Sequence, residues 1–416
     1  MSAESSIPET RVLAIASHVV HGYVGNTMAT FILQALGCEA SAINTVHYSN
    51  HTAYKQVKGR KTPAEEIMEL YEGLKQSFLN DFDVLLSGYM PSAEAVQAVG
   101  KIGRDLRLNA AGKPGSFFWV LDPVMGDQGR CYVPEDEIPQ YKALLREADL
   151  ILPNQFEAEL LSDTKITSLT TLATAMQALH RTYQIPHIII TSLRMSASGT
   201  ISPSTTTNPT HLTIIGSTAR RDLSPRLFRL DIPAYPLFFS GTGDMFAALT
   251  VPRLREAAAS AGLLGTPAWR SPDDVPAADL PLARAVERVL ESMQAVLGAT
   301  AAYAARAVEV LEAAEGRAGL GGGADDDDDS AARRRHLALM KASEVRVVQN
   351  ARHLLLGPER EGEPPRVKFR AEEVRVEGFD GRAGEPKPDE LGVVNLGVGA
   401  RKGEGEGAVL VGRPGS

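Results

Sequence analysis

A glycine-rich segment, Ser240-Gly241-Thr242-Gly243-Asp244, precedes an apolar stretch with helical spacing. Glycines at a helix start expose backbone N–H groups, and the helix dipole adds positive potential there. Such a site suits a phosphoryl group in transfer, and a carboxylate beside it could accept a proton from an attacking hydroxyl. Taken alone, Asp244 is more often a simple helix cap. The flanking glycines and the segments described below favour the catalytic interpretation.

Two acidic segments each follow a short apolar run. Asp122-Pro123-Val124-Met125-Gly126-Asp127 comes directly after FFWVL, and Pro153-Asn154-Gln155-Phe156-Glu157 comes after DLIL. Carboxylates in such places can hold Mg²⁺ together with phosphate oxygens and water. The first segment is equally consistent with an Asp-Pro turn. In the second segment, Asn154 and Glu157 have capping-box spacing, which is a sufficient structural explanation and is compatible with a second role at a cation.

Two polar segments follow the first two apolar runs. The segment SHVVHGYVGN at 17–26 has neither the ending of a Walker A motif nor the glycine pattern of a dinucleotide fold. Its two histidines lack a third metal ligand, so we interpret them as ordinary loop residues. The segment SNHTAY at 49–54 could orient a small polar ring, and a simple turn is equally consistent with it.

Short apolar runs alternate with helical stretches along the chain, which predicts an α/β fold with a mostly parallel sheet. In such sheets, ligands bind beyond the carboxyl ends of the strands, where the polar segments above lie. The predicted strands are 11–16, 39–46, 83–87, 117–121, 149–152, 187–191, 211–215, 226–232 and 344–349, and the predicted helices are 27–36, 63–79, 242–259 and 281–315.

Composition limits the classes of protein that fit. The 416 residues carry a net charge of -8, which argues against non-specific binding of nucleic acid. Two cysteines give no disulfide framework, the N-terminus lacks the apolar core of a signal peptide, and no apolar run could span a membrane. We therefore expect a cytoplasmic protein, and a nuclear pool stays open.

Eight segments together resemble the pyridoxal kinase family of the ribokinase-like superfamily. A GTGD segment marks only the superfamily, whereas SHVxxGYVGN and SNHT are more specific to the pyridoxal branch. The resemblance covers about residues 10–255 and, more loosely, 281–356. The matching segments are 17–26, 43–52, 85–91, 122–127, 132–136, 153–161, 189–193 and 240–249, and EVRVVQ resembles the last strand of the family.

The resemblance implies a three-layer α/β/α fold, a homodimer, and phosphorylation by ATP of the 5′-hydroxymethyl group of pyridoxal. Pyridoxine and pyridoxamine are further expected substrates, and the product, pyridoxal 5′-phosphate, would place the protein in vitamin B6 salvage. The implied cofactors are ATP, Mg²⁺ or another divalent ion, and K⁺.

Site residues are implied by the same resemblance, each through its motif. Asp244 is the expected base, and the amides of Gly241, Thr242 and Gly243 form the expected anion hole. The expected substrate contacts are Ser17, Val24, Thr52 and Tyr89. The expected nucleotide contacts are Asp127, Tyr132, Asn154, Glu157, Thr191 and Ser192, with Asp127 and Glu157 near Mg²⁺, partly through water, and Asp122 and Thr191 at a monovalent cation.

Some residues depart from the family pattern. Leu152 stands where the family usually has Thr, so a hydroxyl near the nucleotide or K⁺ is absent, and Ala53 replaces a Gly beside the substrate segment. A related kinase for hydroxymethylpyrimidine or a sugar, and a catalytically weak regulatory protein, are the alternatives. The retained Asp244 argues against the second of these.

The predicted domain organisation is one kinase domain over residues 1–356. It carries an insertion at 260–280 and a disordered acidic loop at about 316–336. Residues 357–416 are rich in Gly, Pro and charge, and we expect a disordered tail.

Overall fold

A large mixed sheet forms the centre of the computed structural model, which describes residues 7–196, 199–203, 211–318, 328–355 and 368–376. All of these residues belong to one compact unit, Met1–Gly381. The sheet order is β13-β12-β11-β9-β8-β5-β4-β1-β2-β3, and β10 pairs with β9 outside this path. The strands are β1 Arg11–Val19, β2 Glu39–Tyr48, β3 Gly59–Lys61, β4 Val84–Ser87, β5 Phe118–Leu121, β8 Leu150–Ile151, β9 His187–Met195, β10 Ile201–Ser202, β11 His211–Thr218, β12 Leu227–Pro233 and β13 Glu372–Glu373, with β6 Gly126–Asp127 and β7 Arg130–Cys131 forming a separate pair.

The middle of the sheet is parallel. Strands β2, β1, β4, β5, β8 and β9 pair in parallel with their neighbours, whereas β3, β11, β12 and β13 pair antiparallel at the two sides. Strand β5 explains the continuous apolar runs: Phe118 and Val120 enter one core, while Trp119 and Leu121 enter the other. A parallel strand covered on both faces needs apolar residues at every position.

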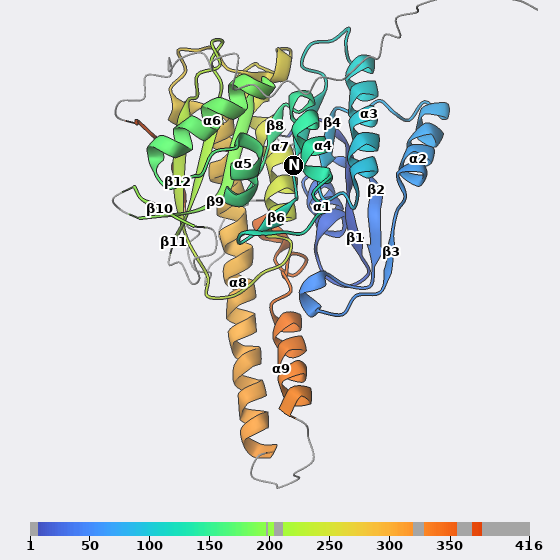
Figure 1. Ribbon diagram of the computed structural model, residues 1–416, viewed down its shortest axis with the longest axis vertical. Helices are drawn as coiled ribbons and strands as arrows, with labels where there is room; N and C mark the ends of the chain where they lie inside the picture. The colour runs from blue at the N-terminus through green and yellow to red at the C-terminus, as the bar shows by residue number, and fades with distance from the viewer. Residues whose placement is uncertain (1–6, 197–198, 204–210, 319–327, 356–367, 377–416) are drawn as a thin grey trace, which may run out of the picture. The chain divides into compact units, whose positions relative to one another are not determined.

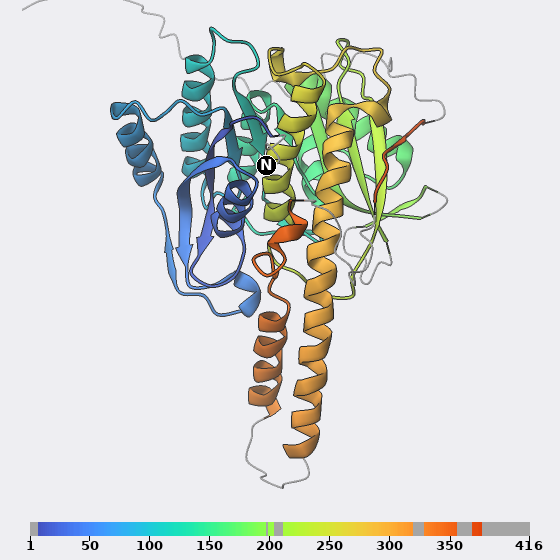
Figure 2. The same ribbon diagram turned by 180° about the vertical axis from the view of Figure 1, so that it is seen from behind.

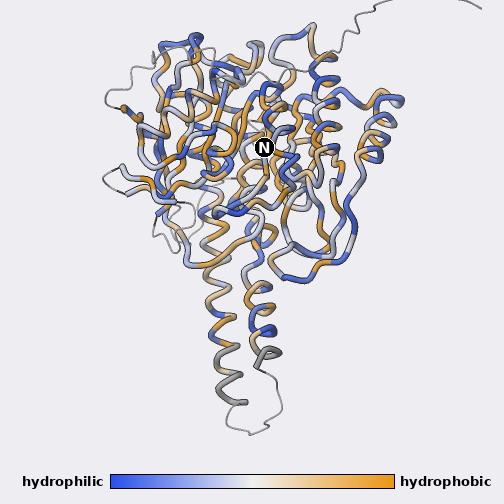
Figure 3. The backbone as a smooth tube through the Cα atoms, in the orientation of Figure 1, coloured by the Kyte–Doolittle hydropathy of each residue, from blue (hydrophilic) through white to orange (hydrophobic). Residues whose placement is uncertain are grey.

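Helices cover both faces of the sheet and complete the three layers (Figures 1 and 2). One core contains apolar residues of α1, α7 and α8, and the other contains those of α2 to α6. The hydropathy colouring shows apolar residues along the strands between the two helix layers (Figure 3). The helices are α1 Gly25–Ala35, α2 Ala64–Gln76, α3 Ala93–Asn109, α4 Glu137–Leu144, α5 Gln155–Ser162, α6 Leu169–Tyr183, α7 Thr242–Ser260, α8 Pro281–Ala318 and α9 Asp328–Ala342.

Helices α8 and α9 lie side by side and extend beyond the sheet layers (Figures 1 and 2). Within the described part of the chain, no helix is both long enough and apolar enough to span a membrane.

The structure differs from the sequence-based expectations at the C-terminal side. The strand predicted at 344–349 is wrong, because these residues form bends and turns in which Val345 and Val347 are buried. Helix α9 starts at Asp328, so the part of the predicted disordered loop from 328 to 336 is helical, while 319–327 lie outside the described residues.

The expected disordered tail is also partly wrong. Phe369 is buried, and β13 pairs with β12 at the edge of the sheet. Strand β13 could not be predicted from the sequence, because it has only two residues, both charged, and so shows no alternation of apolar and polar residues. Residues 357–367 and 377–416 lie outside the described residues.

Candidate active site

The predicted site segments meet at one edge of the sheet. Strands β1, β2, β4, β5, β8 and β9 are parallel, so their carboxyl ends lie along the same edge. The segments after β1, β2, β4, β5 and β8 supply most of the predicted substrate, cation and nucleotide residues. Ser17 lies near the end of β1, and Thr191 and Ser192 lie within β9. The topology therefore brings together residues that are far apart in sequence.

Gly241 is the N-cap of α7 and has a φ of +80°. A Cβ atom at this position would lie 2.2 Å from the carbonyl oxygen of Tyr23 and 3.1 Å from a methyl carbon of Val24. Only glycine combines this backbone conformation with so close an approach. The start of α7 is thereby packed directly against the segment that follows β1.

Asp244 lies in the first turn of α7 and is partly buried. The backbone N–H of Gly25 donates a hydrogen bond to its carboxylate. Gly25 itself lies so close to Ser17 that a Cβ there would be 2.3 Å from the Ser17 hydroxyl oxygen. The expected base and the first expected substrate contact therefore flank the same glycine.

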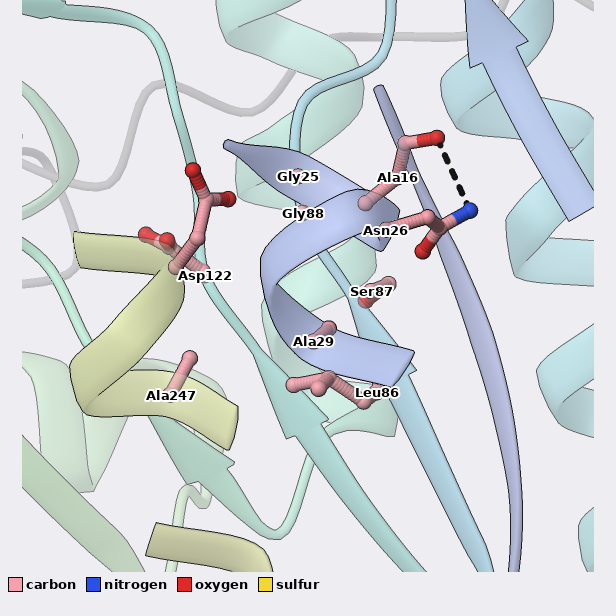
Figure 4. Close-up of a pocket in the computed structure, with 10 residues that line it drawn as sticks. Ala16, Gly25, Asn26, Ala29, Leu86, Ser87, Gly88, Asp122 and Ala247 are labelled. Carbon is pink, nitrogen blue, oxygen red and sulfur yellow. Dashed lines mark hydrogen bonds between the residues drawn. The ribbon is translucent and has the colours of Figure 1, made fainter. Parts of the chain in front are cut away.

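A small pocket opens between the starts of α1 and α7 and the ends of β1, β4 and β5 (Figure 4). Asn26 fixes this corner, because its amide nitrogen donates to the carbonyl oxygens of Ala16 and Ile43 at 3.2 and 2.9 Å. The lining residues are Ala16, Gly25, Asn26, Ala29, Leu86, Ser87, Gly88, Asp122, Asp244 and Ala247.

Asp122 lines this pocket, and two other carboxylates repel its negative charge. Burial raises the pKa of Asp122 well above its usual range, and the negative charges of Glu157 and Asp244 raise it further. Burial also raises the pKa of Asp244 to about 6, against the Gly25 hydrogen bond, which lowers it. A nearby cation would relieve this repulsion, because an opposite charge favours the ionised form of a carboxyl.

Glu157 is held by backbone donors at the start of α5. One carboxylate oxygen accepts from the N–H groups of Met125 and Gly126 at 2.9 and 3.3 Å, and the other accepts from the N–H of Asn154 at 2.9 Å. The predicted capping box is therefore present. Burial nevertheless raises the pKa of Glu157 to about 7, and the negative charge of Asp127 adds to this, although its backbone donors lower it.

The remaining nucleotide candidates lie around the same segments. The side chain of Asn154 donates to the carbonyl oxygen of Gly126 at 2.7 Å, and the N–H of Thr191 donates to the carbonyl oxygen of Pro153 at 3.1 Å. Asp127 is partly buried, which raises its pKa, while Tyr132 is 61% exposed. Ser192 is partly buried on β9, next to Thr191.

The substrate candidates come from three segments. Val24 is buried at the N-cap of α1, and Tyr89 is partly buried, with its carbonyl oxygen accepting from the Thr45 hydroxyl at 2.7 Å. Thr52 is exposed in the short turn Thr52–Tyr54. Its neighbour His51 reaches the glycine-rich segment 240–244, the expected phosphate-binding segment, because its Nδ1 lies 3.2 Å from the Ser240 hydroxyl oxygen.

Sequence reasoning missed Glu344, which lies in the segment that we had expected to be a strand. Its Oε1 accepts hydrogen bonds from Nε2 of His51 and from the hydroxyl of Tyr54, both at 2.9 Å. The sequence offers one signal for this residue: Glu344 is the first residue of the EVRVVQ segment, and it directly precedes the alternating apolar residues.

A three-layer α/β/α fold with a glycine-capped helix start and a carboxylate in its first turn defines a kinase of the ribokinase-like class. A family described as phosphomethylpyrimidine kinase matches residues 28–218. Human pyridoxal kinase is 40% identical over 250 residues, which cover 58% of this chain and 76% of the human protein. Sheep pyridoxal kinase is 39% identical over the same shares of both chains. The chain belongs to the pyridoxal kinase family.

A solved structure supports the same conclusion. The pyridoxal kinase of Leishmania donovani in complex with ADP and pyridoxamine is 28% identical, with a TM-score of 0.65. The match covers 88% of this chain and all of that one.

Proposed function

We propose that this chain transfers the γ-phosphoryl group of ATP to the 5′-hydroxymethyl oxygen of pyridoxal, and also of pyridoxine and pyridoxamine. The observation that carries the proposal is the position of Asp244 at the glycine-capped start of α7, hydrogen-bonded to Gly25. Family membership and the Leishmania complex with ADP and pyridoxamine support the choice of substrates.

In the proposed reaction, the hydroxymethyl oxygen forms a bond to phosphorus while the bond from phosphorus to the ADP oxygen breaks. The hydroxyl proton passes to the carboxylate of Asp244. The backbone N–H groups of Gly241, Thr242 and Gly243 receive the negative charge of the phosphoryl oxygens, helped by the dipole of α7. A base and preorganised donors supply most of what phosphoryl transfer requires from a protein.

The vitamer is proposed to lie between the segments after β1, β2 and β4. Ser17, Val24, Thr52 and Tyr89 would contact the pyridine ring. The nucleotide would lie along the ends of β5, β8 and β9, against Asp127, Tyr132, Asn154, Glu157, Thr191 and Ser192.

The oxygen ligands near the proposed nucleotide site are suited to Mg²⁺, which accompanies ATP, and to K⁺. Asp127 and Glu157 would face Mg²⁺ beside the phosphates, and Asp122 and Thr191 would bind K⁺. Among the described residues, no cluster of three or more acidic, His or Cys side chains is arranged to hold a metal ion by itself. Mg²⁺ usually takes one or two carboxylates and completes its shell with phosphate oxygens and water, so Asp127 and Glu157 would be enough protein ligands beside bound phosphates.

We further propose a cytoplasmic homodimer that acts in vitamin B6 salvage, as the resemblance to the family implies. The proposed catalytic domain spans residues 1–356, to which residues 368–376 add the edge strand β13.

The experiment that tests the proposal is a kinase assay on purified protein with ATP and a panel of pyridoxal, pyridoxine, pyridoxamine, hydroxymethylpyrimidine and ribose, with and without K⁺. We expect pyridoxal 5′-phosphate as the main product. The Asp244→Asn protein controls for contaminating kinases and should lose about 10²–10⁴-fold in kcat. The match to the phosphomethylpyrimidine kinase description makes hydroxymethylpyrimidine the strongest competing substrate. Preferred turnover of that compound would overturn the pyridoxal proposal.

A further inference from the structure

Glu344 belongs to a C-terminal segment that is fixed to the core of the protein. The neighbouring Val345 and Val347 are buried in the core on the α7 and α8 face of the sheet. The N–H of Arg346 donates to the hydroxyl of Thr300 on α8 at 3.1 Å. The backbone around Glu344 therefore has little freedom, and its carboxylate is presented from a rigid support.

The carboxylate of Glu344 is enclosed by two segments of the proposed substrate site. Its side chain is 14% exposed, and one oxygen accepts from both His51 and Tyr54. The other oxygen would lie 2.8 Å from a Cβ atom at Gly22, where φ is +102°. The segment after β1 thus also lies against Glu344, and the absence of a side chain at Gly22 leaves room for the carboxylate.

His51 extends the contact to the phosphate-binding segment. Its Nε2 faces Glu344 at 2.9 Å, and its Nδ1 faces the Ser240 hydroxyl at 3.2 Å. An ionised carboxylate only accepts hydrogen bonds, so the ring nitrogen beside it must carry a proton. In the neutral ring, Nδ1 is then an acceptor for the Ser240 hydroxyl.

Glu344 stays ionised in this setting. Burial alone would raise its pKa, but the hydrogen bonds from His51 and Tyr54, together with the nearby His51 and His21 rings, lower the pKa below its ordinary value. Helix α9 adds a second contact to the same segment, because Nε2 of His336 lies 2.9 Å from the carbonyl oxygen of Ala53. The C-terminal part of the chain therefore contacts the segment on both sides of Thr52.

We propose that Glu344 is a positioning residue for phosphoryl transfer. Through one tautomer of His51 it holds Thr52 beside the vitamer site and Ser240 beside Gly241. The proposal rests on the proposed function, because Thr52 and Gly241 act there. Small displacements of groups that orient a substrate are costly in rate, so a residue that does not touch the substrate can still set turnover.

The kinetic test compares five variants with the parent protein, among them the single change His51→Asn. Glu344→Ala should lower kcat/KM for pyridoxal about tenfold, as loss of a hydrogen bond to a charged group would, with the KM for ATP within about twofold. Glu344→Gln keeps an acceptor oxygen and should recover part of the loss. Because His51 and Glu344 act together, Glu344→Ala combined with His51→Asn should cost no more than the larger single change. Glu66→Ala removes a carboxylate paired with exposed Arg60 and should leave both constants unchanged.

Additive losses in the double variant, or equal losses for Glu344→Ala and Glu344→Gln, would overturn the proposal. A second measurement does not need turnover. Nitrogen-15 spectra of histidine-labelled protein, with His51 assigned by the His51→Asn variant, should show an Nε2–H ring in the parent and a tautomer mixture in Glu344→Ala. An Nδ1–H ring in the parent would also overturn it. Lack of pyridoxal turnover in the parent would refute the proposed function, whereas an Nε2–H ring in the same sample would still support the contact.

Discussion

The indole ring of Trp269 stacks on the phenyl ring of Phe118, with ring centroids 4.1 Å apart and planes 13° apart. Phe118 begins β5 in the parallel part of the sheet, while Trp269 comes from the segment 260–280. Trp269 is 2% exposed, and its indole N–H donates to the carbonyl oxygen of Gly115 at 2.8 Å. The segment that we interpreted as an insertion is therefore part of the hydrophobic core.

Replacing Trp269 by alanine should lower the free energy of unfolding by about 3–5 kcal/mol, because it removes a buried aromatic side chain and leaves a cavity. Urea denaturation followed by circular dichroism would measure the change. Phe78 is 89% exposed, so Phe78→Ala should change stability by less than about 0.5 kcal/mol. Equal effects of the two substitutions would mean that 260–280 is not a structural part of the core.

The sequence predicted the middle of the sheet well for a physical reason. Strands covered on both faces must be apolar throughout, so runs such as 83–87 and 149–152 mark β4 and β8 to within a residue. The segment 344–349 has the alternation of a strand, yet Val345 and Val347 are buried from irregular backbone packed on α8, while Val348 is 42% exposed. An alternation of apolar and polar residues indicates which side chains are buried, but it does not require a strand. Bends and turns can bury the same side chains, as they do here.

The candidate site was predictable where motifs follow parallel strands, because the topology brings such segments to one edge. Glu344 was not predictable in this way. It contacts His51 across 293 residues of sequence, and it lies at no strand end. Only the three-dimensional path of α8 and α9 brings it to the site.

Leu152 stands where the family usually has threonine. The sequence alone predicts weaker nucleotide or K⁺ contacts here, because leucine lacks the threonine hydroxyl. In the structure, Leu152 is 3% exposed and packs in the core on the α7 face. We predict that Leu152→Thr lowers the free energy of unfolding by about 2–4 kcal/mol, since it removes buried carbon and buries a hydroxyl. Urea denaturation would test this, with exposed Leu108→Thr as the matched control. An unchanged stability together with stronger K⁺ activation would contradict the prediction.

Asp244 gives a specific prediction for the dependence of rate on pH. Burial raises its pKa to about 6, and the proposed base acts only as the carboxylate. The value of kcat/KM for pyridoxal should therefore fall as pH drops through about 6, approaching a tenfold loss per pH unit below it. Initial rates between pH 5 and 9, with recovery of full activity after return to pH 8, would measure it. A fall of kcat/KM that begins only near pH 4, where an ordinary aspartate titrates, would contradict the raised pKa.

The same carboxylate should reduce the stability of the fold. An aspartate with a raised pKa binds its proton more tightly in the folded protein than in the unfolded chain, so stability falls as pH rises from about 4 to about 6 and stays lower above that range. Asp244→Asn removes this charge and its repulsion with Asp122, so the variant should unfold at a higher urea concentration than the parent at pH 8. The gain should shrink at pH 5, where much of the parent carboxylate is protonated. Asp163→Asn, at a side chain that is 78% exposed, should show no such gain. A less stable Asp244→Asn protein at pH 8 would mean that the hydrogen bond from Gly25 outweighs the cost of the buried charge.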